Sequence, residues 1–244
     1  MRRRQLGYIM VPRRGILARR ASGGDPDFAS VVLLALNENG ADGSTTFDDA
    51  STSDKALTAN GNAQWDTAQA PTGLTSSGLF DGVGDSITTP DSVDWDLPGD
   101  FTVEIWFRPT ALPANYAHLI GSDGGSVPVI IYVRNSTNSG RIEAWDSGSA
   151  LLMQGGTTSA GGAFYAVAWT RSGSDNSLYL DGTRVATATA STSIAPTGSM
   201  GLGRGPSAAN WDFNGHLAAA RITKGVARYT GASYSVPMLP LPTS

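Results

Sequence analysis

The sequence predicts an all-β protein whose strands form a two-sheet antiparallel sandwich. Apolar residues alternate strictly with other residues over 101–108, which is the period of a half-buried strand. Short apolar runs recur between segments rich in Gly, Ser, Thr and Asn, and no capped segment with helical periodicity reaches ten residues. Each sheet must therefore bury its apolar face against another sheet rather than against helices.

The segment 101–108 is the best-defined strand. Its apolar face consists of Phe101, Val103, Ile105 and Phe107. Its opposite face consists of Thr102, Glu104, Trp106 and Arg108. Aromatic and β-branched side chains pack well on a pleated surface, so we assign the apolar face to the core of the sandwich.

Further strands are expected on both sides of this segment. Residues 31–36 form a continuous apolar run, which predicts a strand in the centre of a sheet. The dipeptides Asn60-Gly61 and Asp181-Gly182 suit tight turns between strands. The expected strands are 56–59, 63–65, 79–80, 82–83, 86–89, 117–120, 127–133, 141–145, 151–153, 164–171, 178–180, 184–186, 199–202 and 216–223.

Charge is unevenly distributed along the 244 residues, whose net charge is −4. The first twenty residues contain seven arginines and no acid, whereas the remainder carries a net charge of −11. We therefore divide the chain into an arginine-rich N-terminal arm, residues 1–24, and a single β-sandwich domain, residues 25–244.

The arm has three interpretations: a solvated disordered tail, a peptide that docks on a partner protein, or a nucleic-acid-binding segment. Docking is favoured because apolar side chains between the arginines have no use in a purely solvated tail. Binding to nucleic acid is disfavoured because the acidic body would oppose it. The expected docking residues are Arg2, Arg3, Arg4, Tyr8, Ile9, Met10, Arg13 and Arg14.

Composition excludes several kinds of site. The chain has no cysteine, so it contains no disulfide, thiolate metal site or cysteine nucleophile. No apolar run approaches the ~20 residues of a transmembrane helix. The apolar run at 6–11 is too short for the core of a signal peptide. We therefore expect no association with a membrane.

Three motifs occur in a fixed order along the chain. They are 79–87 leading to 99–108, then 166–171 followed by 178–182, and finally 213–216 continuing through 221–230. In this order they resemble the concanavalin A-like, laminin-G-type jelly rolls, and they look most like the branch found in tailed-phage virion proteins. The resemblance extends over about residues 25–240 and implies a jelly-roll β-sandwich.

Metal binding has little support within this resemblance. Many relatives carry acidic residues after the glycine of the third motif, where this chain has Leu217-Ala218-Ala219. A calcium site built from Asp81, Asp85 and Asp181 stays open, although Asp-Gly turns explain these residues more simply. We expect no cofactor, with structural calcium as the alternative.

Catalysis is also poorly supported, and no catalytic residue is assigned. Glycosidases need two carboxylates across the scissile bond, but neither Glu104 nor Glu143 has a second acid on its own strand face. A pair formed between strands by these two residues stays open, with ordinary solvent-facing charge favoured. The two histidines, His118 and His216, are interpreted as packing or surface residues.

Two aromatic and acidic pairs are candidates for glycan binding. Glu104 and Trp106 share a face of one strand, and Glu143 and Trp145 share a face of another. An indole can stack on a sugar ring while a carboxylate accepts hydrogen bonds from its hydroxyls. The favoured alternative is that these tryptophans pack beneath loops or at a subunit contact.

From the resemblance we expect a non-enzymatic structural protein of a tailed-phage virion, acting as a capsid decoration, head fibre or tail-associated protein. The arm would anchor it to capsid or tail proteins, and the jelly roll would be exposed on a particle assembled in the host cytoplasm. Homo-oligomerisation is expected because particle proteins occupy symmetric sites. A glycan-binding adhesin or lectin is the alternative function, and a glycosidase ranks third.

Overall fold

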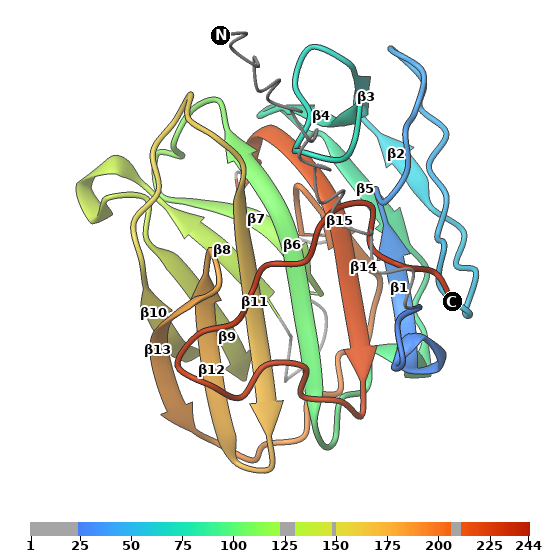
Figure 1. Cartoon of the computed structure of the whole chain (residues 1–244). Helices are drawn as coiled ribbons and strands as arrows, with labels where there is room; N and C mark the ends of the chain where they lie inside the picture. Colours follow the sequence, from blue (N-terminus) through green and yellow to red (C-terminus); the bar gives the residue numbers. More distant parts are fainter. Residues whose placement is uncertain (1–23, 123–129, 148–149, 206–210) are drawn as a thin grey trace, which may run out of the picture.

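The computed structural model describes residues 24–122, 130–147, 150–205 and 211–244. Its strands form two antiparallel sheets, one behind the other, which confirms the predicted all-β sandwich (Figure 1). Within these ranges no helix is long and apolar enough to cross a membrane. The predicted docking residues of the arm lie outside the described residues.

Sheet A has the strand order β13-β12-β11-β6-β15-β4-β3, and β1 also pairs with β15. Its strands are β1 (Val31–Ala35), β3 (Gln64–Asp66), β4 (Ser77–Asp81), β6 (Phe101–Pro109), β11 (Tyr165–Ser172), β12 (Asp175–Leu180), β13 (Thr183–Thr189) and β15 (Asn214–Lys224).

Sheet B has the strand order β10-β9-β8-β7-β14-β5-β2. Its strands are β2 (Thr58–Asn60), β5 (Ser86–Thr89), β7 (Tyr116–Gly121), β8 (Ile130–Arg134), β9 (Ile142–Ser147), β10 (Ala150–Gly155) and β14 (Met200–Leu202). Short 3₁₀ helices lie in the connections at η1 (Phe28–Ser30), η2 (Val93–Trp95) and η3 (Ser136–Asn138).

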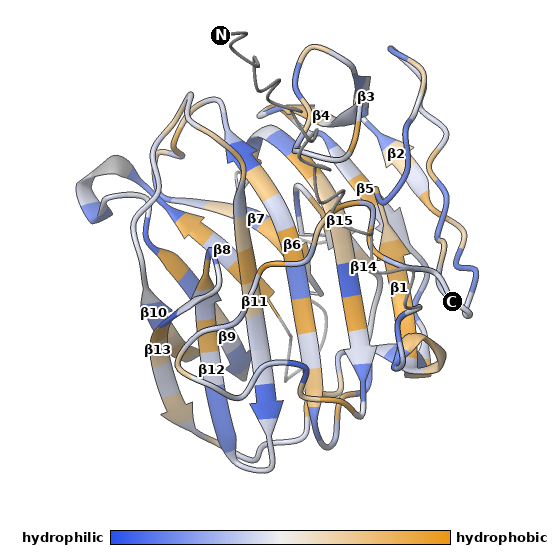
Figure 2. Cartoon of the chain, in the orientation of Figure 1, coloured by the Kyte–Doolittle hydropathy of each residue, from blue (hydrophilic) through white to orange (hydrophobic). Residues whose placement is uncertain are grey.

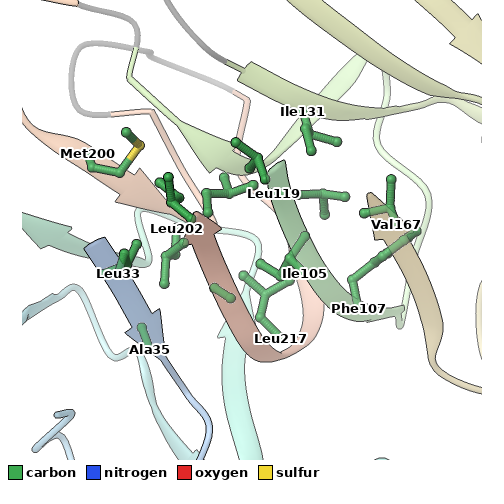
Figure 3. Packing of buried hydrophobic residues seen from close by; sticks show 14 of the residues in the cluster. Leu33, Ala35, Ile105, Phe107, Leu119, Ile131, Val167, Met200, Leu202 and Leu217 are labelled. Atoms are coloured by element: carbon green, nitrogen blue, oxygen red, sulfur yellow. The ribbon is translucent and has the colours of Figure 1, made fainter. Parts of the chain in front are cut away.

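The main core lies between the two sheets. Sheet A contributes the whole predicted apolar face of β6, and sheet B contributes alternate residues of β7, β8 and β14. Figure 3 shows part of this core, with Ile105 of β6 near Leu119 of β7 and Phe107 on the side of Val167 of β11. Bands of apolar and polar residues alternate along β6 and β15 (Figure 2). The alternation places Glu104 and Trp106 on the outer face of sheet A, away from this core.

β15 changes neighbours halfway along its length. Its first half pairs with β4 and its second half pairs with β1, and the pairing with β6 shifts register between Ala218 and Arg221. Ala219 has a φ of 46° at this bulge and donates its backbone N–H to the carbonyl oxygen of Leu36 at 2.8 Å. The shift places Arg221 directly opposite Glu104.

The hairpin predicted at Asp181-Gly182 is present between β12 and β13. Asp181 and Gly182 have φ values of 48° and 76°, as a tight turn of this kind requires. A Cβ on Gly182 would lie 2.3 Å from the carbonyl oxygen of Tyr234, so the turn also needs glycine for close packing.

Three strand predictions differ from the structure. Residues 82–83 form no strand, because they lie in the bend between β4 and β5, where Gly82 has a φ of 86°. Strands form on both sides of Asn60-Gly61, but β2 pairs with β5 in sheet B and β3 pairs with β4 in sheet A, so the turn crosses between sheets. The run at 31–36 is not in the centre of its sheet, because β15 is the only described strand that pairs with β1, along half of its length. The other edge of β1 forms a single bridge between Ala35 and Asp49. The run is apolar throughout because its two faces contact separate apolar clusters.

The C-terminal segment, residues 225–244, covers the outer face of sheet A. In Figure 1 it crosses in front of β12, β11, β6 and β15 before ending beside β1. Its Leu239 and Leu241 are buried in a second apolar cluster together with Trp106 and Ala218. The segment therefore covers a sheet face that would otherwise be in contact with solvent.

Candidate functional site: an aromatic face on sheet B

The predicted pair Glu104 and Trp106 lies beneath the C-terminal segment. Glu104 is 1% exposed and Trp106 is 6% exposed. Leu239 and Leu241 pack in the same cluster as Trp106, so the indole does not form an open platform on the surface of the sheet. This pair, which the sequence presents as a candidate exposed glycan site, is therefore buried, as the alternative of tryptophans packed beneath other segments predicted.

Glu104 belongs to a buried charge network that consists of Asp25, Glu104, Arg221, Arg228 and Tyr229. Arg221 donates to Glu104 at 2.8 Å and to Asp25 at 3.1 Å, and both terminal nitrogens of Arg228 donate to Asp25 at 2.9 Å. Burial raises the pKa of Glu104, although the charges of Arg221 and Arg228 oppose this. The carboxylates of Asp25 and Glu104 balance the charges of Arg221 and Arg228, and their hydrogen bonds attach the chain near residue 25 to β6 and β15.

The second predicted pair, Glu143 and Trp145, lies on the outer face of sheet B, on the opposite side of the sandwich. The indole N–H of Trp145 donates to Oε2 of Glu143 at 3.1 Å. Arg141 lies 3.2 Å and Arg134 lies 3.5 Å from Oε1 of the same carboxylate. Because Glu143 is 2% exposed, its main effect is to fix the positions of Trp145 and the two arginines.

Trp145 belongs to a cluster that we call the aromatic face. It consists of Tyr116, Tyr132, Trp145 and Trp211. The ring centroid of Tyr116 lies 5.9 Å from that of Trp145 and 5.6 Å from that of Trp211. The centroid of Tyr132 lies 6.0 Å from that of Trp145 and 5.4 Å from that of Trp211. Such spacings are typical of interacting aromatic rings.

The strand register explains why these side chains meet. Tyr116 of β7 is opposite Arg134 of β8, and Tyr132 of β8 is opposite Glu143 of β9. Side chains alternate across a strand, so residues that flank core positions on β7, β8 and β9 share the outer face of sheet B. Trp211 comes from outside the sheet, and its carbonyl oxygen accepts a hydrogen bond from the backbone N–H of His118 at 3.0 Å.

The aromatic face combines partly exposed rings with cationic donors. Tyr116, Trp145 and Trp211 are partly exposed, whereas Tyr132 is buried beneath them. The guanidinium carbon of Arg134 lies 4.0 Å from the ring centroid of Tyr116, a cation–π contact. The side chain of Arg141 is 33% exposed, so its guanidinium can donate to a ligand lying on the rings.

Sequence reasoning found Glu143 and Trp145 but missed Tyr116, Tyr132 and Trp211. The alternation of Tyr132 and Arg134 with core residues along 130–134 was a usable signal for an aromatic and cationic strand face. Trp211 follows a Gly- and Ser-containing stretch without strand periodicity, so no local pattern connects it with β7 and β8.

A family model described as the concanavalin A-like lectin/glucanases superfamily matches residues 81–227, more than half of the chain. The chain belongs to this superfamily. No curated protein sequence matches it significantly.

Solved structures share the superfamily fold at low sequence identity. Domain 4 of AbnA, an extracellular arabinanase from Geobacillus stearothermophilus solved with arabinotriose, has a TM-score of 0.58 and 16% identity; the match covers 82% of this chain and 94% of that domain. The binding domain of Paraclostridial Mosquitocidal Protein 1 has a TM-score of 0.61 and 13% identity, and the match covers 81% of this chain and 49% of that chain. The binding domain of Botulinum Neurotoxin DC, solved with SialylT, has a TM-score of 0.55 and 12% identity. That match covers 80% of this chain and 48% of that chain.

Other residues considered for chemistry in this superfamily member have structural partners. Nε2 of His216 lies 2.8 Å from Oδ2 of Asp66, and burial lowers the pKa of the imidazole although Asp66 opposes the shift. His118 is fully buried, and its Nε2 lies 3.2 Å from the carbonyl oxygen of Gly121. Glu104 and Glu143 lie on outer faces of different sheets, so these two carboxylates do not face each other.

The three aspartates considered for calcium accept backbone hydrogen bonds. Asp85 accepts from the N–H groups of Asp81 and Asn62, both at 2.8 Å. Asp181 accepts from the N–H of Ala166 at 2.8 Å, across the end of the hairpin. Within the described ranges, no group of three or more His, Asp or Glu side chains is arranged to hold a metal ion. The third-motif residues Leu217, Ala218 and Ala219 are fully buried in the two apolar clusters.

Proposed function

We propose that this protein is a glycan-binding module and that the aromatic face of sheet B is its binding surface. The observation that carries the proposal is the set of partly exposed rings, Tyr116, Trp145 and Trp211, beside Arg134 and Arg141. The flat C–H face of a sugar ring stacks on an aromatic ring, and guanidinium groups donate hydrogen bonds to sugar hydroxyls and carboxylates.

The superfamily relatives support a binding function. The arabinanase domain was solved with arabinotriose, and the neurotoxin domain with SialylT. The match covers 94% of the arabinanase domain, so the fold corresponds to nearly the whole of that domain. Fold likeness alone does not identify a ligand, and the proposal rests on the aromatic face.

The proposal favours binding without turnover. A glycosidase mechanism requires two carboxyl groups facing each other across the bond that breaks. Glu104 is sealed beneath the C-terminal segment, and Glu143 is held by Arg134, Arg141 and Trp145 on the other side of the sandwich. Neither carboxylate is available to act as a nucleophile or acid on a glycan lying over the rings.

Trp145→Ala and Trp211→Ala test the binding surface. We first screen the full chain on a glycan array and then measure affinity for the best oligosaccharide by calorimetry. Each substitution should weaken binding about tenfold or more, because the loss of one stacking ring removes roughly 1.4 kcal/mol or more of binding free energy.

Val83→Ala is the matched control, since it truncates an apolar side chain that is 76% exposed outside the aromatic face. Circular dichroism and thermal unfolding verify that each variant is folded. Glycan binding that survives in the folded double variant Trp145→Ala, Trp211→Ala would show that the aromatic face is not the binding surface.

Display on a phage particle remains a prediction from the sequence alone. It rests on the resemblance of the three ordered motifs to the branch found in tailed-phage virion proteins, and the arginine-rich arm that would anchor the protein lies outside the described residues up to residue 23. The relatives named above are an arabinanase domain and toxin binding domains, so they support the glycan-binding alternative and not the virion assignment. A protein that is displayed on a virion and binds glycans there would satisfy both the proposed function and the virion prediction.

A further inference from the structure

A pocket lies on the outer face of sheet A, on the opposite side of the sandwich from the aromatic face. Its volume is about 420 Å³. β6 contributes Trp106 and Arg108 to its lining. Three further segments complete it: residues 69–72 between β3 and β4, residues 162–164 before β11, and residues 236–239 of the C-terminal segment. A pocket of this size accommodates a small molecule such as one or two sugar rings.

Arg108 presents an unneutralised charge to this pocket. Its Nε donates to the carbonyl oxygen of Gly162 at 2.8 Å, which fixes the plane of the guanidinium. Among the described residues, no carboxylate lies within ion-pair distance of Arg108. A guanidinium carries five N–H donors in a rigid fork, so the terminal nitrogens remain available for the two oxygens of a carboxylate.

Trp106 and Phe164 give the pocket an aromatic side. Trp106 is 6% exposed, and Phe164 is partly buried against the same apolar cluster. The polar residues Gln69 and Thr72 also line the pocket. The pocket thus offers the partly exposed ring of Phe164, polar lining residues and one cation, which match the C–H face, the hydroxyls and the carboxylate of a sugar acid.

We propose that this pocket binds a uronic acid residue, with its carboxylate on the terminal nitrogens of Arg108 and its ring against the partly exposed Phe164. The site is separate from the proposed glycan surface, because it is built on the opposite sheet. Apolar contact alone would not distinguish a sugar acid from a neutral sugar, so Arg108 determines the preference.

The test compares D-galacturonate with D-galactose, which lacks the C6 carboxylate, by isothermal titration calorimetry on the full chain. We expect D-galacturonate to bind at least tenfold more tightly, because only its carboxylate can pair with Arg108. In Arg108→Gln the affinity for D-galacturonate should fall to that for D-galactose. Arg108→Lys, which keeps the charge but loses the fork, should give an intermediate affinity.

Arg184→Gln is the matched control, because it removes an exposed arginine of β13 that does not line the pocket and should leave D-galacturonate binding unchanged. Trp145→Ala reports on the aromatic face separately: D-galacturonate binding that is lost in Trp145→Ala but kept in Arg108→Gln would overturn the pocket and support the aromatic face instead. Equal binding of the two sugars, no binding of either, or full D-galacturonate binding in folded Arg108→Gln would overturn the proposal. Benzoate binding as tightly as D-galacturonate would also overturn it, because the pocket would then select aromatic carboxylates instead of sugar acids.

Discussion

Asp25 is the residue on which the charge network depends most. Its carboxylate accepts hydrogen bonds from Arg221 of β15 and from both terminal nitrogens of Arg228 in the C-terminal segment. The side chain is only 3% exposed, so water cannot replace these partners if one is removed. Removing one charge from a buried pair is costly because the remaining charge is left without compensation.

Asp25→Asn should therefore destabilise the protein at pH 7 by about 3 kcal/mol, as expected for a buried ion pair that loses one partner. The measurement is the free energy of unfolding from denaturant titrations. Asp27→Asn is the control: the Asp27 side chain is 39% exposed and lies 3.9 Å from Arg228, so its loss should cost less than about 1 kcal/mol. Equal effects of the two substitutions would contradict this prediction.

The effect of Asp25→Asn should depend on pH. Burial by itself raises the pKa of Asp25, but hydrogen bonds from Arg228 and from the backbone N–H of Asp27, with the charges of both arginines, lower it below its usual 3.8. A carboxyl group whose pKa is lowered on folding stabilises the protein above its unfolded pKa, and this contribution is lost as the pH falls through the folded pKa. The stability difference between the wild type and Asp25→Asn should therefore shrink below about pH 4.

At the scale of elements, the C-terminal segment acts as an outer layer on sheet A. Asn37 attaches it to the end of β1: its side-chain Nδ2 donates to the carbonyl oxygen of Leu241 at 2.9 Å, and its Oδ1 accepts from the N–H of Leu241 at 2.7 Å. Tyr234 donates its N–H to the carbonyl oxygen of Gly182 at 2.8 Å, which holds the segment to the β12–β13 turn. The segment is thus attached at both sides of the sheet.

Leu241→Ala should lower the free energy of unfolding by about 2–4 kcal/mol, the usual cost of truncating a buried leucine. Leu241 is 2% exposed, whereas Met238 of the same segment is 76% exposed. Met238→Ala should consequently change stability by less than about 0.5 kcal/mol. Similar losses from both substitutions would mean that burial of this segment does not contribute to stability as the structure indicates.

Across the whole molecule, the two outer faces of the sandwich differ in how far they are covered. The outer face of sheet A is covered by the C-terminal segment except where the pocket at Arg108 opens, whereas sheet B carries the partly exposed aromatic face. The described strands pair with one another within residues 31–224. Residues 1–23 lie outside the described residues, so the separate role of the arm at 1–24 stays a prediction from charge.

Deletion of residues 2–22 should leave the melting temperature unchanged within about 2 °C, because a change of less than 0.5 kcal/mol shifts it by no more than that in a domain of this size. The same truncation tests the virion hypothesis, since we expect it to abolish incorporation into particles while glycan binding persists. Normal incorporation of the truncated chain would contradict the docking role of the arm. A large drop in melting temperature would instead place the arm in the folded domain.

Local patterns in the sequence predicted several parts of this protein correctly. The alternation at 101–108 identified β6 and its core face, and Asp181-Gly182 identified a hairpin, because side-chain periodicity and turn chemistry act within a few residues. The ordered motifs predicted the superfamily fold. Glu143 and Trp145 were selected as a pair, and the structure places them on the aromatic face.

Only the tertiary structure decided which strand faces are exposed. Glu104 and Trp106 look solvent-facing by periodicity, but a segment more than a hundred residues later covers them, as the contact between Tyr229 and Glu104 illustrates with a separation of 125 residues. The two short strands beside Asn60-Gly61 joined different sheets, and Trp211 met Tyr116 and Tyr132 from outside the sheet. Burial depends on what packs over a strand from distant parts of the chain, and local periodicity carries no information about that packing.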